Sequence, residues 1–128
     1  MSLALVATGY KRPVRIGYRH FSLMRQGIAA AYSPKHGELY DEIISFRNRL
    51  DFDKIVEQWN DGCNDDLDIL LMRSDCDGQL SVDECRRVLR VLKTLQVSFE
   101  DEVLQKNYSD FLDILMHCVK KRVIMRFC

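Results

Sequence analysis

Apolar residues at helical spacing dominate most of the chain. Phe21, Met24 and Ile28 recur at intervals of three or four residues, and later segments repeat this spacing. Such spacing places apolar side chains on one face of a helix, where they can pack into a core. Gly37 predicts a break between the first two helices. The predicted helices cover residues 21–32, 38–50, 53–59, 64–72, 82–95 and 111–119, with a further helical stretch from 98 that is interrupted near Asn107.

Two short segments near the ends of the chain alternate instead with a period of two. Residues 14–18 and 123–128 each place apolar side chains on one face, which predicts strands. We expect the two strands to pair into a small sheet that needs the helices packed on it. The predicted fold is mainly α (α+β): one compact helical domain over residues 1–128, with about five or six helices. Residues 1–12 are a candidate flexible N-terminal segment.

Charge is balanced over the whole chain but segregated along it. Residues 1–37 carry six basic and no acidic side chains, residues 38–84 carry fourteen acidic and four basic, and residues 85–128 carry five acidic and nine basic. A net charge of zero gives no global argument for nucleic acid or an anionic membrane, so we expect neither as a partner. The acidic middle could lie against the basic N-terminal part or face a basic partner protein. The candidate interaction residues are Asp61, Asp65, Asp66, Asp68, Asp75 and Asp77.

Cysteine usage and hydropathy point to a reduced compartment. No stretch approaches the roughly 18 uninterrupted apolar residues of a membrane span, and no signal-peptide pattern opens the chain. The five cysteines form an odd set without a C-x-x-C pair, so neither a disulfide framework nor a zinc ribbon is indicated. We expect a cytoplasmic protein in which Cys85 and Cys118 are buried in helices. Cys76 is the candidate reactive thiol.

Residues 73–84 nearly reproduce a twelve-residue calcium loop. With Gly78 at the sharp turn, Glu84 falls at position 12, but Arg73 occupies position 1, where a carboxylate normally binds the ion. Arginine offers only donors and a fixed positive charge, so weak or no calcium binding is expected. A turn at Asp77-Gly78 followed by a capping box accounts for the same residues. The ligands of the alternative Ca²⁺ site would be Asp75, Asp77, Gln79, Ser81 and Glu84.

Three separated motifs carry a resemblance to a known group of proteins. They are Gly17-Tyr18-x-x-Phe21-x-x-x-Arg25, the block Ser74-Asp-Cys-Asp-Gly-x-Leu-Ser-x-x-Glu-Cys85, and the closing Arg126-Phe127-Cys128. In order and spacing the chain resembles a group of small uncharacterised bacterial and phage proteins. The block alone also resembles one in immunity proteins of bacterial polymorphic toxins. The resemblance implies a compact intracellular domain and names no substrate.

Motifs of common enzyme classes are missing from the sequence. It holds no G-x-S-x-G, no phosphate-binding glycine loop and no H-E-x-x-H. We therefore expect a non-enzymatic protein-interaction module, of the immunity type, with an acidic central surface and no cofactor. The alternatives are a degenerate calcium-binding protein with a single loop and a redox sensor that acts through Cys76.

Overall fold

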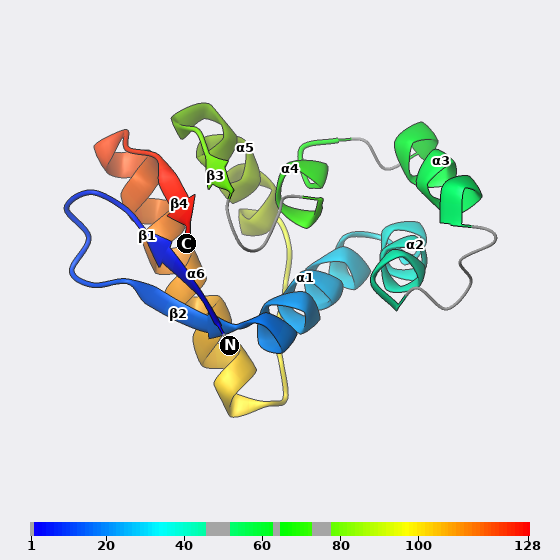
Figure 1. Ribbon diagram of the computed structural model, residues 1–128, viewed down its shortest axis with the longest axis horizontal. Coiled ribbons are helices and arrows are strands. Elements are labelled where there is room, and N and C mark those ends of the chain that lie inside the picture. The colour runs from blue at the N-terminus through cyan, green and yellow to red at the C-terminus, as the bar shows by residue number, and fades with distance from the viewer. Residues whose placement is uncertain (1, 46–51, 63–64, 73–77) are drawn as a thin grey trace.

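The sheet that joins the two ends of the chain has four strands rather than two (Figure 1). The computed structural model describes residues 2–45, 52–62, 65–72 and 78–128. Neighbouring strands are antiparallel throughout, in the order β2-β1-β4-β3. The strands are β1 (Ser2–Val6), β2 (Val14–Gly17), β3 (Gln79–Leu80) and β4 (Met125–Phe127).

The central position of β1 corrects two predictions. Residues 1–12 were expected to be flexible, yet Leu3 and Leu5 of β1 are fully buried. The strand from residue 14 was expected to pair with the C-terminal strand, but β1 lies between them and pairs with both. The reason is physical: the run Leu3-Ala-Leu5 is buried on both faces, so it lacks the polar alternation by which a half-buried strand is recognised.

Helices form most of the remaining described chain, which confirms the mainly α fold with a small sheet that includes both terminal strands. Most of them begin or end within a few residues of the positions that apolar spacing predicted. The helices are α1 (Tyr18–Tyr32), α2 (Pro34–Ser45), α3 (Phe52–Gly62), α4 (Asp68–Leu71), α5 (Val82–Lys93) and α6 (Glu102–Lys121).

Two predicted helix breaks do not occur. Helix α2 continues through Gly37, where an added Cβ would lie only 2.9 Å from Cα of Ala30 in α1. Glycine therefore allows a close approach between the two helices instead of ending one of them. Helix α6 likewise runs without interruption past Asn107. Its buried residues Leu104, Tyr108 and Phe111 keep helical spacing across that point.

The core lies between the sheet and the helices α1, α5 and α6. Helix α6 contacts β1, β2 and β4, and the ring of Phe21 in α1 meets that of Phe127 in β4 edge to face, with centroids 5.9 Å apart. Helices α2 and α3 extend away from the sheet, and α3 packs against α2 (Figure 1). The molecule therefore has two distinct ends, which we call the hairpin end (the β1–β2 loop and the C-terminal part of α6) and the α3 end.

Candidate functional site

The calcium-like block is described only from Gly78 onward. The predicted residues Asp75, Cys76 and Asp77, together with Arg73, lie outside the described residues. Gln79 pairs with Arg126 in the β3–β4 ladder, and the carbonyl of Gly78 accepts from the backbone N–H of Phe127 at 2.9 Å. The second half of the block is thus built into the sheet and leads directly into α5.

Ser81 and Glu84 form the predicted capping box. The hydroxyl of Ser81 accepts from the backbone N–H of Glu84 at 3.1 Å, and Oε1 of Glu84 accepts from the backbone N–H of Ser81 at 2.9 Å. These bonds satisfy two amides that a helix start otherwise leaves without partners. Among the described residues, no group of three or more His, Cys, Asp or Glu side chains could hold a metal ion.

Arg25 is a buried cation of α1 that no pattern in the sequence marks as a contact to another element. Its side chain is 6% exposed, and Nη1 donates to the carbonyls of Leu70 and Leu71, both at 3.3 Å. The guanidinium also lies 4.5 Å from the ring centroid of Phe21. Because these carbonyls belong to the last turn of α4, the positive charge stabilises the helix end that leads into residues 73–77. Phe21 in turn meets Phe127, whose backbone N–H donates to the carbonyl of Gly78, so described residues of all three motifs are in contact one after another.

A second buried polar network is centred on His36, which is 5% exposed. Its Nδ1 lies 2.7 Å from Oγ of Ser33, and its Nε2 lies 3.1 Å from Oδ2 of Asp65. The rings of Tyr32 and Trp59 meet the imidazole edge to face. Ser33 Oγ also accepts from the backbone N–H of His36, which caps the first turn of α2. The network therefore ties the start of α2 to α3 and to the segment before α4.

Hydrogen bonding in this network has the order Ser, His, Asp that serine hydrolases use. A neutral imidazole satisfies every contact if Ser33 donates to Nδ1 and Nε2–H donates to Asp65. The hydroxyl of Ser33 is already held as a helix cap, and His36 is enclosed by aromatic rings. We interpret the network as a structural clamp.

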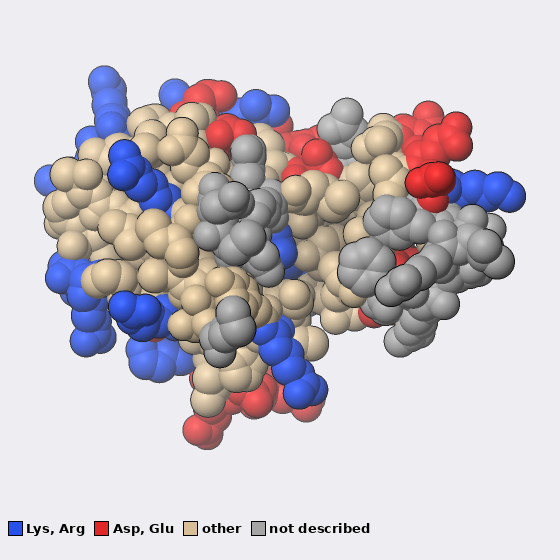
Figure 2. Space-filling model, viewed as in Figure 1, with Lys and Arg blue, Asp and Glu red and all other residues tan. Residues whose placement is uncertain are grey.

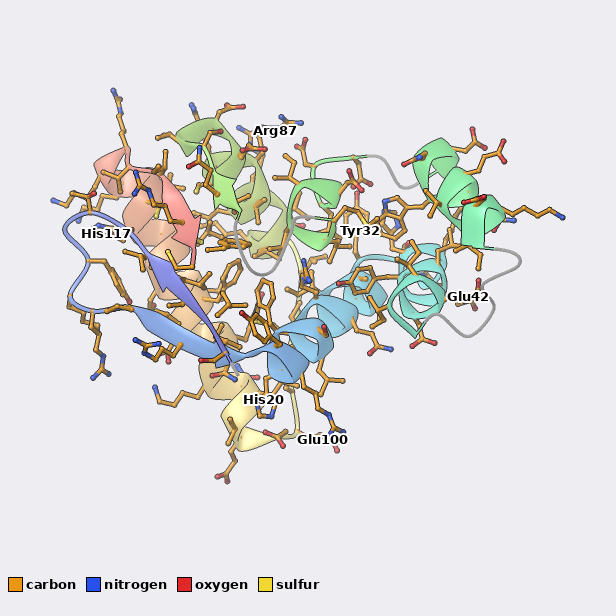
Figure 3. All side chains as sticks on the ribbon, viewed as in Figure 1. His20, Tyr32, Glu42, Arg87, Glu100 and His117 are labelled. Atoms are coloured by element: carbon orange, nitrogen blue, oxygen red, sulfur yellow. The ribbon has the colours of Figure 1, made fainter. Side chains whose placement is uncertain are left out.

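Three of the predicted interaction residues have intramolecular partners. Oδ1 of Asp66 accepts from Nε and Nη2 of Arg87 at 2.9 and 2.7 Å, and Arg87 projects from α5 on the side of α4 (Figure 3). Asp68 accepts from the indole N–H of Trp59, and Asp65 accepts from His36 and from the backbone N–H of Leu67. These carboxylates hold α3, α4 and α5 together in addition to any role at the surface.

Asp61, by contrast, belongs to an exposed row of acids on α3. Asp53, Glu57 and Asp61 follow one another at intervals of four residues, and all three are exposed. We call this row the acidic stripe. Glu57 and Asp61, together with Lys54 and Gln58, line a surface hollow of about 530 Å³. Asp53 and Glu57 were not among the interaction residues predicted from the sequence, although their spacing of four residues places them on one helix face with Asp61.

The two helical cysteines are buried, as predicted. The thiol of Cys85 donates to the carbonyl of Leu80 at 3.8 Å, and that of Cys118 to the carbonyl of Ile124 at 3.9 Å. A hydrogen bond with Cys118, followed by burial, raises the pKa of the Cys85 thiol. The same hydrogen bond lowers the pKa of the Cys118 thiol. Cys85 is therefore the protonated donor of the pair near neutral pH. Cys128, in contrast, is an exposed free thiol.

Comparisons with protein-family models, with curated proteins and with solved structures find no match to this chain. Among the described helices, none is both long enough and apolar enough to cross a membrane. We therefore infer function from the chain's own residues.

Proposed function

We propose that this chain is a non-enzymatic protein-interaction module whose acidic stripe binds a basic surface on a partner protein. The observation that carries the proposal is the row Asp53, Glu57 and Asp61 along the exposed face of α3. The resemblance of the Asp-Cys-Asp-Gly block to immunity proteins supports a toxin-class partner, which such a module would bind and neutralise.

The fold does not need the acidic stripe. Helix α3 is held by its opposite side, where Trp59 is fully buried and Ile55 is 9% exposed. Like charges four residues apart repel by roughly 0.2–0.5 kcal/mol per pair, although Asp53, in the first turn of α3, is also favourable for the helix dipole. None of the three carboxylates forms an ion pair with a described residue. A cationic partner would relieve this repulsion.

The position of the stripe also suits a partner. Helix α3 lies at the far edge of the molecule, and red side chains gather over it in the space-filling view (Figure 2). The hollow beside Glu57 and Asp61 has the volume for a lysine or arginine side chain, and the exposed Lys54 on its lining would have to turn outward. Because Asp65, Asp66 and Asp68 are used in internal contacts, we assign the interaction to the stripe instead of to these three.

The test compares two variants with the same change in charge. Glu57→Lys/Asp61→Lys reverses the stripe, and Glu100→Lys/Glu102→Lys reverses two exposed acids at the other side of the fold, near the start of α6. Wild type and both variants are used as bait in lysate of the native host, and candidate partners are then purified and titrated directly. We expect a purified partner whose affinity falls at least tenfold with the stripe variant, is unchanged with the control, and weakens as salt rises.

Three outcomes would contradict the proposal: a partner whose binding is equal for both variants, a partner insensitive to salt, or no partner that binds once purified. Lysine near the C-terminus of α3 is favourable for the helix dipole, so Asp61→Lys is not expected to unfold the helix. Circular dichroism checks that both variants keep the wild-type helix content.

A further inference from the structure

At the hairpin end, cations that are distant in sequence come together. The β1–β2 loop lies along α6, where Nε2 of His117 is 2.9 Å from the carbonyl oxygen of Thr8. The rings of Tyr10 and His117 meet edge to face with centroids 5.2 Å apart. Figure 3 shows His117 beside this loop. These contacts fix the loop against the helix, and Gly9 allows the tight turn with its positive φ of 82°.

A pocket of about 520 Å³ lies between the loop and α6. Its lining includes the cations Lys11, Arg12, Arg15 and Lys106, the ring of Tyr10 and the amide of Asn107.

Charge in this pocket is unbalanced. Lys106 is paired with Asp110 at 2.9 Å, whereas Lys11, Arg12 and Arg15 form no ion pair with a described residue. Asp113 is a second carboxylate near the pocket. Burial raises the pKa of the Tyr10 hydroxyl most, and the negative charges of Asp113 and Asp110 raise it further.

Further cations extend the positive surface beyond the pocket. Lys120, Lys121 and Arg122 lie at the end of α6, about one turn past His117, and all three are exposed. Blue side chains accordingly project from the edge of the hairpin end in the space-filling view (Figure 2).

We propose that this basic pocket binds single-stranded nucleic acid. Lys11, Arg12 and Arg15 form no ion pair with a described residue and suit successive phosphates of a strand. Nζ of Lys11 lies 5.9 Å from the ring centroid of Tyr10 and can leave it for a phosphate, so that the ring can stack on a base, while Asn107 offers an amide for a base edge. An acidic peptide would use the cations but would leave the ring and the amide without a matching group. The proposed acidic stripe lies at the opposite end of the molecule, so the two surfaces can be tested separately.

This inference reverses the expectation drawn from net charge. A total charge of zero hides the segregation of cations along the chain, and Lys11, Arg12 and Arg15 come beside Lys106 only through the packing of the hairpin on α6. The electrostatic potential at a surface, and not the net charge of the whole protein, determines whether a polyanion is attracted to that surface.

The experiment measures fluorescence anisotropy of labelled oligo-dT and oligo-U of about 12 nucleotides, at about 50 mM salt and above. Wild type is compared with Lys11→Gln/Arg12→Gln and with the matched control Arg90→Gln/Lys93→Gln, which removes two exposed cations of α5. We expect the pocket variant to bind at least tenfold more weakly and to lower the slope of log K against log salt by about 1.4, since each phosphate contact on a single strand contributes about 0.7. The control should bind like wild type.

A second variant and a competitor separate nucleic acid from other anions. Tyr10→Leu removes the stacking ring and should weaken binding about fivefold or more with little change in salt slope. Polyglutamate of equal charge should compete much less well than unlabelled oligonucleotide. The proposal is overturned if wild type does not bind at low salt, if both double variants lose affinity equally, if Tyr10→Leu binds like wild type, or if polyglutamate competes as well as the oligonucleotide.

Discussion

Nε2 of His36 lies 3.1 Å from Oδ2 of Asp65, and this contact joins parts of the chain that are 29 residues apart. It belongs to a network in which His36 also contacts Ser33 and the indole of Trp59. Helix α3 packs mainly on α2, and the network adds a connection from these two helices to the segment before α4. The stability of this part of the fold should therefore depend on the imidazole.

Replacing His36 by leucine should destabilise the protein. The substitution removes one hydrogen bond from the Asp65 carboxylate and one from the Ser33 hydroxyl, while each keeps its bond to a backbone N–H. A lost hydrogen bond costs about 0.5–1.5 kcal/mol, and more where one partner is charged. We expect a loss of about 2 kcal/mol in the free energy of unfolding, measured by urea denaturation. His20→Leu, in the first turn of α1 and outside the network, is the control and should change stability by less than about 0.5 kcal/mol. An equal loss of unfolding free energy in His36→Leu and His20→Leu would contradict a structural role for the His36 network.

Arg25→Met tests the buried cation at the end of α4. The variant keeps much of the apolar contact with Phe21 but removes the donor to the carbonyls of Leu70 and Leu71. We expect a loss of about 2–3 kcal/mol in thermal or urea unfolding, and an intermediate loss for Arg25→Lys, which keeps the charge but not the planar fork. Arg19→Met, at an exposed position of the same helix, should be nearly neutral. An unaffected Arg25→Met protein would show that the contact to α4 is dispensable.

Elements that hold themselves together locally could be predicted from the sequence. Helix α5 was predicted because Ser81 and Glu84 cap its start and Cys85, Val88 and Leu89 repeat at helical spacing. The last strand was predicted because its apolar residues alternate. In both cases the signal lies within a few adjacent residues, so it does not depend on the rest of the fold.

Features that depend on distant partners could not be predicted in this way. No local signal shows that His36 meets Asp65, that Arg25 reaches the end of α4, or that Lys11 and Arg12 lie beside α6. The same holds for β1, whose burial on both faces comes from strands on either side and helices behind it. For the candidate sites, the residue types could be read from the sequence, but which of these residues lie on one surface depends on how the elements pack.

Leu5→Asp tests whether β1 is a structural strand. Leu5 is fully buried and pairs with Val14 on one side and Phe127 on the other. A carboxylate there would be desolvated without a partner, so we expect the variant to be unfolded or to lose at least about 3 kcal/mol. Ser2→Asp introduces the same group at an exposed position of the same strand and should fold normally. A folded, stable Leu5→Asp protein would restore the idea of a flexible N-terminal segment.

Two substitutions separate the capping role of the block from calcium binding. Ser81→Ala removes a helix cap and should cost about 1 kcal/mol in the free energy of unfolding. Glu84→Gln keeps an oxygen that can accept from the Ser81 amide, so its stability should stay close to that of wild type. The same change removes the carboxylate that a calcium loop needs at its last position.

Calcium at millimolar concentration should therefore leave the Tm of wild type and of Glu84→Gln unchanged. Ligand binding to the native state raises Tm by mass action, so thermal unfolding is a direct readout. A rise in Tm for wild type that Glu84→Gln abolishes would instead support the calcium site at Asp75, Asp77, Gln79, Ser81 and Glu84. Magnesium serves as the control for a general effect of divalent ions.

The raised pKa of Cys85 predicts a loss of stability in mild alkali. In the unfolded chain this thiol ionises near its ordinary value of 9.0, whereas in the fold it stays protonated to higher pH. The unfolded state then binds fewer protons than the native state as pH rises past that value, so the free energy of unfolding falls, by up to about 1.4 kcal/mol per pH unit for one such group. Below pH 8 the contribution of Cys85 is fully present and constant. The lowered pKa of Cys118 acts in the opposite sense, so the effect of Cys85 is measured as a difference from a variant that keeps Cys118.

Cys85→Ser provides the comparison, because its hydroxyl can still donate to the carbonyl of Leu80 but does not titrate in this range. Urea unfolding is measured from pH 7.5 to 9.5, below the ordinary pKa of 10.0 of Tyr10 and Tyr108, which are also raised in the fold. We expect wild type to lose stability more steeply than Cys85→Ser above pH 8.5, and the two curves to run parallel below pH 8. Parallel curves over the whole range would mean that Cys85 ionises equally in both states, and hence that its contacts with Leu80 and Cys118 do not hold the proton.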